Sequence, residues 1–314
     1  MQLILTITLN PSVDIKYTLS TLAIDQVNRV DDVIKTAGGK GLNVSRVLKQ
    51  LGENVAATGF LGGELGNFIR SELVKSEIVD WFVPVRGETR NCIAIIHEGN
   101  QTEILESGPV IHEEEMEIFL DDFTAKLPEV NLVTISGSLP KGVPDDFYKR
   151  LIAICFEQKK PVLLDTNGRL LQTTLTSKAK PLLIKPNLDE LSGFTGQKIT
   201  TKEELRQALQ CEPLRNIEWV VVTLGATGAL IKYKESLYDV QIPKVEAVNP
   251  VGSGDSVIAG FASGIIRNLE IPALIRYGIT MGVLNAMEEK TGYINPEKIN
   301  WCMEQIKVDH IGSL

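Results

Sequence analysis

A loop of small residues followed at once by a carboxylate is the feature of this chain most suited to chemistry. The turn Asn249-Pro250 leads into Gly252-Ser253-Gly254, then comes Asp255, and an apolar run of small residues follows. Glycines let a backbone approach a ligand closely, and the start of a helix adds unpaired N–H donors and the positive end of the helix dipole. The segment predicts an anion-binding loop beside a carboxylate, which is what phosphoryl transfer to an alcohol requires.

Each part of this segment also has a purely structural interpretation. An aspartate at a helix start is most often a cap, and Gly-x-Gly is often only a turn. Ser253 could itself be the cap, which would free Asp255 for other work. We expect the helix dipole to keep Asp255 ionised and therefore a weak base, which a loose transition state tolerates because the proton can leave late.

A second glycine-rich segment, Gly38-Gly39-Lys40-Gly41-Leu42-Asn43, stands where a loop enters a predicted helix that ends at Leu51. Its glycines allow close approach, the helix start favours anions, Lys40 adds a positive charge, and Asn43 can hydrogen-bond a hydroxyl. The structural alternative is a glycine turn with a solvated lysine. We favour a ligand site, because a plain turn does not need this many glycines.

Three charged residues are candidates for binding a sugar phosphate. Asp14 follows the first predicted strand, at the edge where ligands of open α/β sheets collect, and could hold two sugar hydroxyls. Arg90 opens a predicted hairpin and suits a phosphate, and Arg29 is a weaker candidate of the same kind. A loop carboxylate and solvated surface arginines are the alternatives.

Two further segments follow predicted strands and suit a nucleotide. Lys185 could reach phosphates, and Asn187 and Glu190 share one face of a helix start, where their oxygens suit Mg²⁺, held through water. The segment from Thr223 through Gly225 to Gly228 offers backbone donors. The alternatives are a capped helix with an acidic first turn and a tight strand-to-strand turn.

Composition limits the classes of function. The chain has 314 residues and a net charge of −8, which argues against a general nucleic-acid binder. Its four cysteines are far apart, so buried free thiols are expected rather than disulfides or metal clusters. We find no P-loop, no Rossmann glycine pattern after the first strand, no nucleophile elbow, no signal peptide and no membrane-spanning run, and therefore expect a cytoplasmic protein.

Strand-like and helical patterns alternate along the chain and predict an α/β fold, a mostly parallel sheet with helices on both faces. We expect one domain over residues 1–314. Two polar, strand-rich insertions, at about residues 12–36 and 90–106, lack helical partners and predict a small β-sheet lid over the cleft. An exposed apolar face on such a lid would suit a partner subunit, so a homodimer through the lid is expected.

Taken together, these segments resemble the PfkB (ribokinase-like) carbohydrate kinase family. Residues 38–44 resemble its N-terminal glycine signature, residues 249–255 its C-terminal signature, and residues 187–190 its Asn-x-x-Glu motif, in the same order and over nearly the whole chain. The resemblance implies a three-layer αβα core with a lid, and ATP and Mg²⁺ as cofactors. Asn249-Pro250 stands where many members have Asp-Thr, a replacement common in the phosphosugar branch.

The stretches 6–14 and 88–104 are similar to that phosphosugar branch, and to its tagatose-6-phosphate kinases in particular, with 1-phosphofructokinases as the nearest alternative. The resemblance makes Asp255 the base and Gly252, Ser253 and Gly254 the anion hole. It assigns the sugar phosphate to Asp14, Gly38, Gly39, Lys40, Asn43, Arg90 and Ser138, and ATP and Mg²⁺ to Lys185, Asn187, Glu190, Thr223, Gly225 and Gly228. A non-catalytic sugar or nucleotide sensor on the same fold is the alternative from another class.

Overall fold

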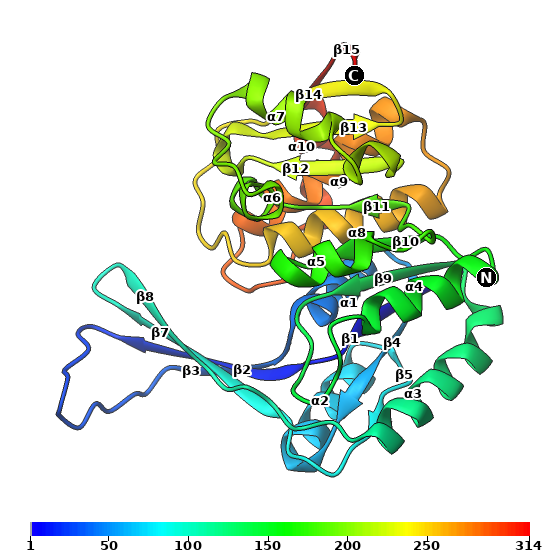
Figure 1. The fold of residues 1–314 in the computed structure, drawn as a ribbon. Helices are drawn as coiled ribbons and strands as arrows, with labels where there is room; N and C mark the ends of the chain where they lie inside the picture. The colour runs from blue at the N-terminus through cyan, green and yellow to red at the C-terminus, as the bar shows by residue number, and fades with distance from the viewer. Residues whose placement is uncertain (1) are drawn as a thin grey trace.

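An 11-stranded sheet forms the centre of the computed structural model, which describes residues 2–314 (Figure 1). Its order is β15-β14-β13-β12-β11-β10-β9-β1-β4-β5, with β6 also paired to β4. Pairing is parallel from β5 to β12 and antiparallel from β12 to β15. The strands are β1 (Leu3–Thr8), β4 (Asn54–Leu61), β5 (Val79–Asp80), β6 (Val83–Pro84), β9 (Leu132–Ser136), β10 (Val162–Asp165), β11 (Leu183–Ile184), β12 (Trp219–Thr223), β13 (Ala229–Tyr233), β14 (Ser236–Gln241) and β15 (Lys307–Ser313).

Helices pack on both faces of this sheet, as the alternating sequence pattern predicts. Strand β12 shows why: Trp219 and Val221 enter one hydrophobic cluster, and Val220 and Val222 enter the other. One face carries α1 (Lys40–Gln50), α2 (Gly63–Lys75), α8 (Ser253–Ile266), α9 (Ile271–Ala286) and α10 (Ile299–Gln305). The other carries α3 (Glu113–Lys126), α4 (Phe147–Glu157), α5 (Gly168–Leu175), α6 (Leu188–Thr195) and α7 (Lys202–Gln210). The predicted α/β class is confirmed.

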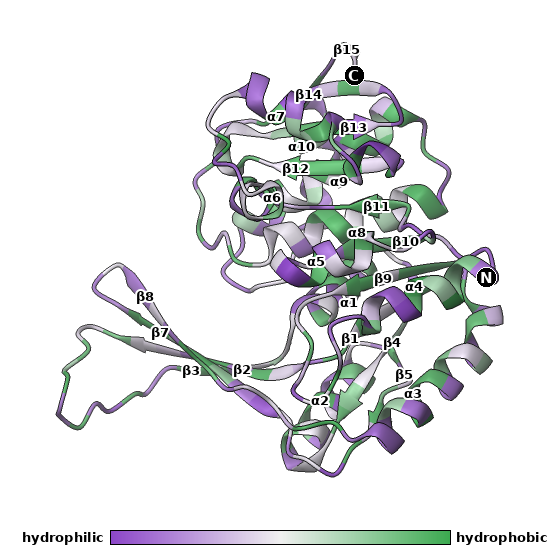
Figure 2. Ribbon diagram, viewed as in Figure 1, coloured by the Kyte–Doolittle hydropathy of each residue, from purple (hydrophilic) through white to green (hydrophobic). Residues whose placement is uncertain are grey.

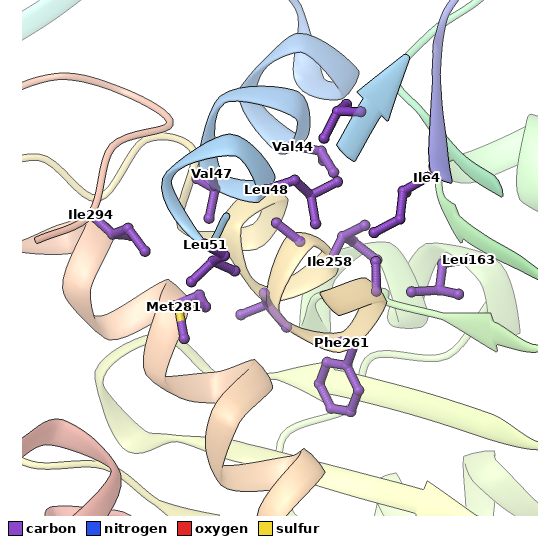
Figure 3. Packing of buried hydrophobic residues seen from close by; sticks show 14 of the residues in the cluster. Ile4, Val44, Val47, Leu48, Leu51, Leu163, Ile258, Phe261, Met281 and Ile294 are labelled. Atoms are coloured by element: carbon purple, nitrogen blue, oxygen red, sulfur yellow. The ribbon is translucent and has the colours of Figure 1, made fainter. Parts of the chain in front are cut away.

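The two helices that begin at the glycine segments, α1 and α8, pack against each other. Val44 and Leu48 of α1 meet Ile258 of α8 in the cluster of Figure 3, beside Ile4 of β1. All four side chains are fully buried. This apolar contact fixes the starts of both helices relative to each other, and with them the two glycine segments.

A second, four-stranded sheet extends away from the core (Figure 1), and we call it the lid. Its order is β3 (Val33–Gly38), β2 (Ser12–Leu19), β7 (Arg90–His97) and β8 (Asn100–Leu105). Glu98 and Gly99 form its hairpin turn with positive φ angles of 50° and 75°, the geometry that matches the twist of paired strands. Hydrophilic and hydrophobic residues alternate along these strands (Figure 2). The lid comes from the two predicted insertions.

Some predicted elements differ from the structure. The sequence pattern predicts a strand over residues 27–36, but the strand β3 begins only at Val33, because residues 20–32 pair with no other strand. The sequence predicts a helix over residues 144–158, but α4 begins at Phe147, since residues 144–146 form a turn closed by Phe147 N–H donating to the Pro144 carbonyl at 2.9 Å. Cysteines were expected to be buried free thiols; all four are free, but only Cys155 and Cys302 are buried, while Cys92 is half-buried and Cys211 is exposed. None of the helices in the described part of the chain combines the length and the apolar composition that crossing a bilayer requires.

Candidate active site

A cavity of about 1160 Å³ opens between the lid and the carboxyl ends of the parallel strands. Ligands of open α/β sheets bind at this edge. The cavity brings together most of the residues singled out in the sequence. Those that line it are Asp14, Gly39, Lys40, Asn43, Arg90, Ser138, Lys185, Asn187, Glu190, Thr223, Gly252, Gly254 and Asp255.

Asp255 lies in the first turn of α8, where the carboxylate faces the other glycine segment. Gly252 precedes the helix with φ 82°, and a Cβ atom there would lie 2.6 Å from the Thr291 Cγ2 atom, so only glycine fits. Asn43 donates from Nδ2 to Asp255 Oδ2 at 2.7 Å. Asp255 is 5% exposed. The two glycine segments therefore form one site.

Burial, together with the nearby carboxylate of Asp165, raises the pKa of Asp255 to about 6. Lys40, the Asn43 hydrogen bond and Lys185 oppose this shift but are outweighed. The expectation of a weakly basic carboxylate, governed by the helix dipole, is therefore wrong. Desolvation wins over the dipole because the side chain is enclosed. The result is a carboxylate that is ionised at pH 7 and more basic than an ordinary aspartate.

The sequence interpretation missed Asp165, which lies at the bottom of the site. Its Oδ2 atom is 3.5 Å from Lys40 Nζ and its Oδ1 atom is 3.3 Å from Lys185 Nζ. Burial acts to raise the pKa of Asp165, but the two lysines outweigh it and the pKa is lowered. An acidic residue at the end of a buried strand, β10, at the ligand edge of the sheet, was the signal that could have identified it.

Lys185 also contacts the anion-binding loop. A Cβ atom on Gly254 would lie 2.9 Å from Lys185 Nζ, so the ammonium group lies directly against this glycine. Asp165 orients this lysine and Lys40 from below, and raises the pKa of Lys40. Two fixed positive charges therefore flank the place where the loop's N–H groups would receive an anion.

Asp14 and Gly38 lie at the lid end of the cavity. Ser12 Oγ donates to Asp14 Oδ1 at 2.6 Å. Burial raises the pKa of Asp14, against the Ser12 hydrogen bond and the positive charges of Arg46 and Arg90. Gly38 does not line the cavity; a Cβ atom there would lie 2.0 Å from Asp14 Cγ, so it makes room for the carboxylate.

Arg90 is already engaged with the backbone, although it lines the cavity. It donates from Nη1 to the Glu106 carbonyl at 2.9 Å and from Nη2 to the Asn10 carbonyl at 3.0 Å. Asn10, which the sequence interpretation also missed, lines the cavity and has a buried Oδ1 atom without a hydrogen-bond partner among the described residues. Ser138 Oγ lies 3.5 Å from Asn10 Nδ2.

The predicted nucleotide residues divide into two groups. Asn187 and Glu190 line the cavity but also cap α6 reciprocally: Glu190 N–H donates to Asn187 Oδ1 at 2.7 Å, and Asn187 N–H to Glu190 Oε2 at 2.9 Å. Thr223 lines the cavity beside them, whereas Gly225 and Gly228 belong to the turn into β13 and do not. The capped-helix and tight-turn interpretations thus describe the local structure.

Two more predicted residues lie outside the cavity lining. Arg29 is exposed, in the lid segment between β2 and β3. Ser253 is the first residue of α8 and does not cap it; the N-cap is Gly252, without a side-chain hydrogen bond. Its Oγ atom instead accepts a hydrogen bond from Asn285 Nδ2 at 3.4 Å.

The donor set fits a magnesium ion bound only in part by protein. No group of three or more His, Cys, Asp or Glu residues within residues 2–314 is arranged to hold a metal. Asn187 and Glu190 keep free lone pairs toward the cavity beyond those used in the cap. Mg²⁺ typically keeps several waters and uses one or two carboxylates together with substrate phosphates. The residues present fit that mode.

Comparisons with known proteins identify the family and the fold of the chain. Residues 7–298 match the pfkB family carbohydrate kinase. A candidate phosphofructokinase from Staphylococcus aureus is 32% identical, with 99% of this chain and 100% of that chain covered and a TM-score of 0.85. A Thermotoga maritima protein described as a possible 1-phosphofructokinase is 27% identical, with 99% and 100% covered and a TM-score of 0.89.

Phosphofructokinase-2 from Escherichia coli is 26% identical, with 97% of this chain and 99% of that chain covered and a TM-score of 0.89. The architecture described above, with its separate small sheet, is thus the ribokinase-like fold of these proteins. The family match spans both glycine segments, Asp165 and the capped helix α6. The chain belongs to the pfkB family of carbohydrate kinases, enzymes that transfer a phosphoryl group to a sugar.

Proposed function

We propose that this chain is an ATP-dependent tagatose-6-phosphate kinase, which phosphorylates the 1-hydroxyl of D-tagatose 6-phosphate to give D-tagatose 1,6-bisphosphate in lactose and galactose breakdown. The observation that carries the kinase assignment is Asp255, a buried carboxylate with a raised pKa, between Asn43 and a glycine loop flanked by two lysines. The choice of sugar rests on the resemblance of residues 6–14 and 88–104 to tagatose-6-phosphate kinases.

Each part of the site has a place in the reaction. Asp255 accepts the proton of the attacking hydroxyl, and the N–H groups at the start of α8 stabilise the charge of the phosphoryl group in transfer. Lys185, held by Asp165, neutralises phosphate oxygens of ATP, while Asp14 holds sugar hydroxyls and the lid closes over them. Mg²⁺, near Asn187 and Glu190, would supply further neutralisation of the nucleotide phosphates.

A second candidate, 1-phosphofructokinase, is favoured by the neighbour from Thermotoga maritima. Structures of Escherichia coli phosphofructokinase-2 with fructose-6-phosphate point to a related ketohexose phosphate. Coupled ADP release with tagatose 6-phosphate, fructose 6-phosphate and fructose 1-phosphate separates these assignments by kcat/KM. If kcat/KM is highest for fructose 1-phosphate, the 1-phosphofructokinase assignment replaces our proposal. Binding of all three sugar phosphates without ADP release would indicate a sensor.

The rate should depend on pH through Asp255. Because the carboxyl must be ionised to accept a proton and its pKa is about 6, kcat/KM should fall about tenfold per pH unit well below pH 6 and level off above pH 7. A pH–rate profile with saturating Mg²⁺-ATP measures this. An acidic limb near pH 4, the ordinary aspartate range, would mean that Asp255 is not the titrating base.

We also propose that two copies of the chain associate through their lids. The support is apolar exposure on the lid: Ile24 and Val27 are 79% exposed, and Ile104 and Leu105 are more than half exposed. The neighbour phosphofructokinase-2 itself has a tetrameric inhibited form.

Leu105→Lys should therefore lower the molar mass in sedimentation equilibrium to that of one chain, because a lysine at an apolar interface costs its desolvation. Phe156→Lys is the matched control, since Phe156 is equally exposed but lies on α4 of the core. Loss of association in both variants, or in neither, would contradict docking through the lid.

A further inference from the structure

Asn43 lies between a group that can only donate hydrogen bonds and a group that, when ionised, can only accept them. Its Nδ2 atom donates to Asp255, and its Oδ1 atom accepts from Arg46 Nη2. A guanidinium has no acceptor and a carboxylate has no donor. One orientation of the Asn43 carboxamide satisfies both neighbours, and the flipped orientation satisfies neither.

Arg46 is itself held in place by the backbone. It donates from Nη1 to the Ala37 carbonyl at the end of lid strand β3, and from Nη2 to the Thr291 carbonyl at 3.2 Å. Its guanidinium carbon also lies 5.8 Å from the centre of the Tyr293 ring. These contacts fix the position of the guanidinium, so an N–H donor stays directed at Asn43 Oδ1.

We infer that Arg46 is a positioning residue, which locks the Asn43 carboxamide with its amino group toward Asp255. Arg46 does not line the cavity and reaches the reaction only through Asn43. The lock favours the ionised carboxylate, because the Nδ2 hydrogen bond stabilises the charged form. A flipped carboxamide would instead face Asp255 with an oxygen and favour its protonated form. The inference rests on the proposed role of Asp255 as the base.

The charge of Arg46 could also act on Asp255 directly, without Asn43. The groups that face Asp255 are Asp165 from β10, Lys40 and Asn43 from α1, and Lys185 after β11. Arg46, also from α1, interacts electrostatically with Asp255 as well. Loss of a positive charge raises the pKa of a carboxyl at any orientation of the amide, so the test must separate orientation from charge.

Arg46→Met removes the donors and keeps an apolar stem. We expect the acidic limb of kcat/KM to move up by about one pH unit, so that the rate relative to wild type is about fivefold lower at pH 6 than at pH 8.5. Gln50→Met is the matched control: Gln50 lies on the same helix and bonds the Arg46 backbone carbonyl, Gly292 and Ile294, but makes no hydrogen bond to Asn43. Its acidic limb should stay at the wild-type position.

The decisive comparison repeats Arg46→Met in an Asn43→Leu background. If Arg46 acts by orienting the carboxamide, the pKa shift of Asp255 should disappear there, because no carboxamide remains to be oriented. If its charge acts directly, the pKa shift should persist. The titration of the Asp255 carboxyl carbon, followed by NMR in the ligand-free protein, reads the same pKa without any substrate. A wrong sugar assignment would leave this titration unaffected. Failure of the proposed function can therefore be distinguished from failure of the inference about Arg46.

Arg46→Lys, which keeps the charge and a donor, guards against misfolding of the methionine variant and should titrate close to wild type. The inference is overturned if Arg46→Met leaves the Asp255 titration unmoved, if its shift survives in the Asn43→Leu background, or if Arg46→Lys shifts it as far as Arg46→Met does.

Discussion

Asp255→Asn should slow turnover by about 10²–10⁴-fold and, at the same time, make the folded chain more stable at pH 7.5. The first effect follows because an amide cannot accept the proton of the sugar hydroxyl. The second follows because the wild-type carboxylate is buried beside Asp165 and is less favourable in the fold than in the unfolded chain. Few substitutions of a buried polar residue are expected to stabilise, so the pair of outcomes is diagnostic.

The sign of the stability effect follows from linkage. The pKa of Asp255 is about 6 in the fold against an ordinary 3.8, so the protonated form is favoured in the native state. The protonated carboxyl therefore contributes its full stabilisation of the fold below pH 3.8, and this contribution is lost as pH rises through 6. The difference of about 2 pKa units corresponds to about 3 kcal/mol at most. The amide introduced by Asp255→Asn cannot ionise, so the variant avoids that loss.

Denaturant unfolding at pH 5 and pH 7.5, together with ADP release, measures both effects. The stability gain of Asp255→Asn over wild type should be larger at pH 7.5 than at pH 5. Near-normal turnover in the variant would reject Asp255 as the base. A stability loss that is equal at the two pH values would mean that the carboxyl is not desolvated as described.

Asp165→Asn should have the opposite effect on stability, a loss of about 3 kcal/mol at neutral pH. The carboxylate is held between Lys40 and Lys185, and Lys185 is only 5% exposed. An amide would leave that buried ammonium group without its counter-charge. Most of the loss comes from Lys185, because Lys40 is 39% exposed and water screens its charge.

The pKa of Asp165 is lowered in the fold, so its contribution to stability is present above the unfolded value and is lost only as pH falls below it. The difference in free energy of unfolding between wild type and Asp165→Asn should therefore persist at neutral pH and disappear only in acid. The acidic limb of the rate should also move to lower pH, because Asp165 helps to raise the pKa of Asp255.

Asp145→Asn is the matched control for Asp165→Asn. Asp145 pairs with Arg169 at 2.8 Å, but both side chains are exposed, and such pairs contribute less than about 1 kcal/mol. Equal unfolding midpoints for the two variants would show that Asp165 is not the buried counter-charge described here.

The sequence predicted the layered core and located both glycine segments, but it missed elements whose signals are short. Helix α7 was overlooked, although Thr201 and Glu204 form a capping box that three-residue spacing could have indicated. Strand β15 was overlooked because it is a mostly exposed edge strand that pairs only with β14, so its residues need no continuous apolar pattern.

The sequence by itself determined the α/β alternation and the two glycine segments that begin helices, because backbone freedom and burial periodicity are local properties of neighbouring residues. Only the tertiary structure decided that Asn43 meets Asp255, that Asp165 joins Lys40 to Lys185, and that desolvation outweighs the helix dipole. Coulomb energies depend on distance and on the surrounding medium. Residues as far apart in the chain as 43 and 255 come close together in a buried environment only when the core packs.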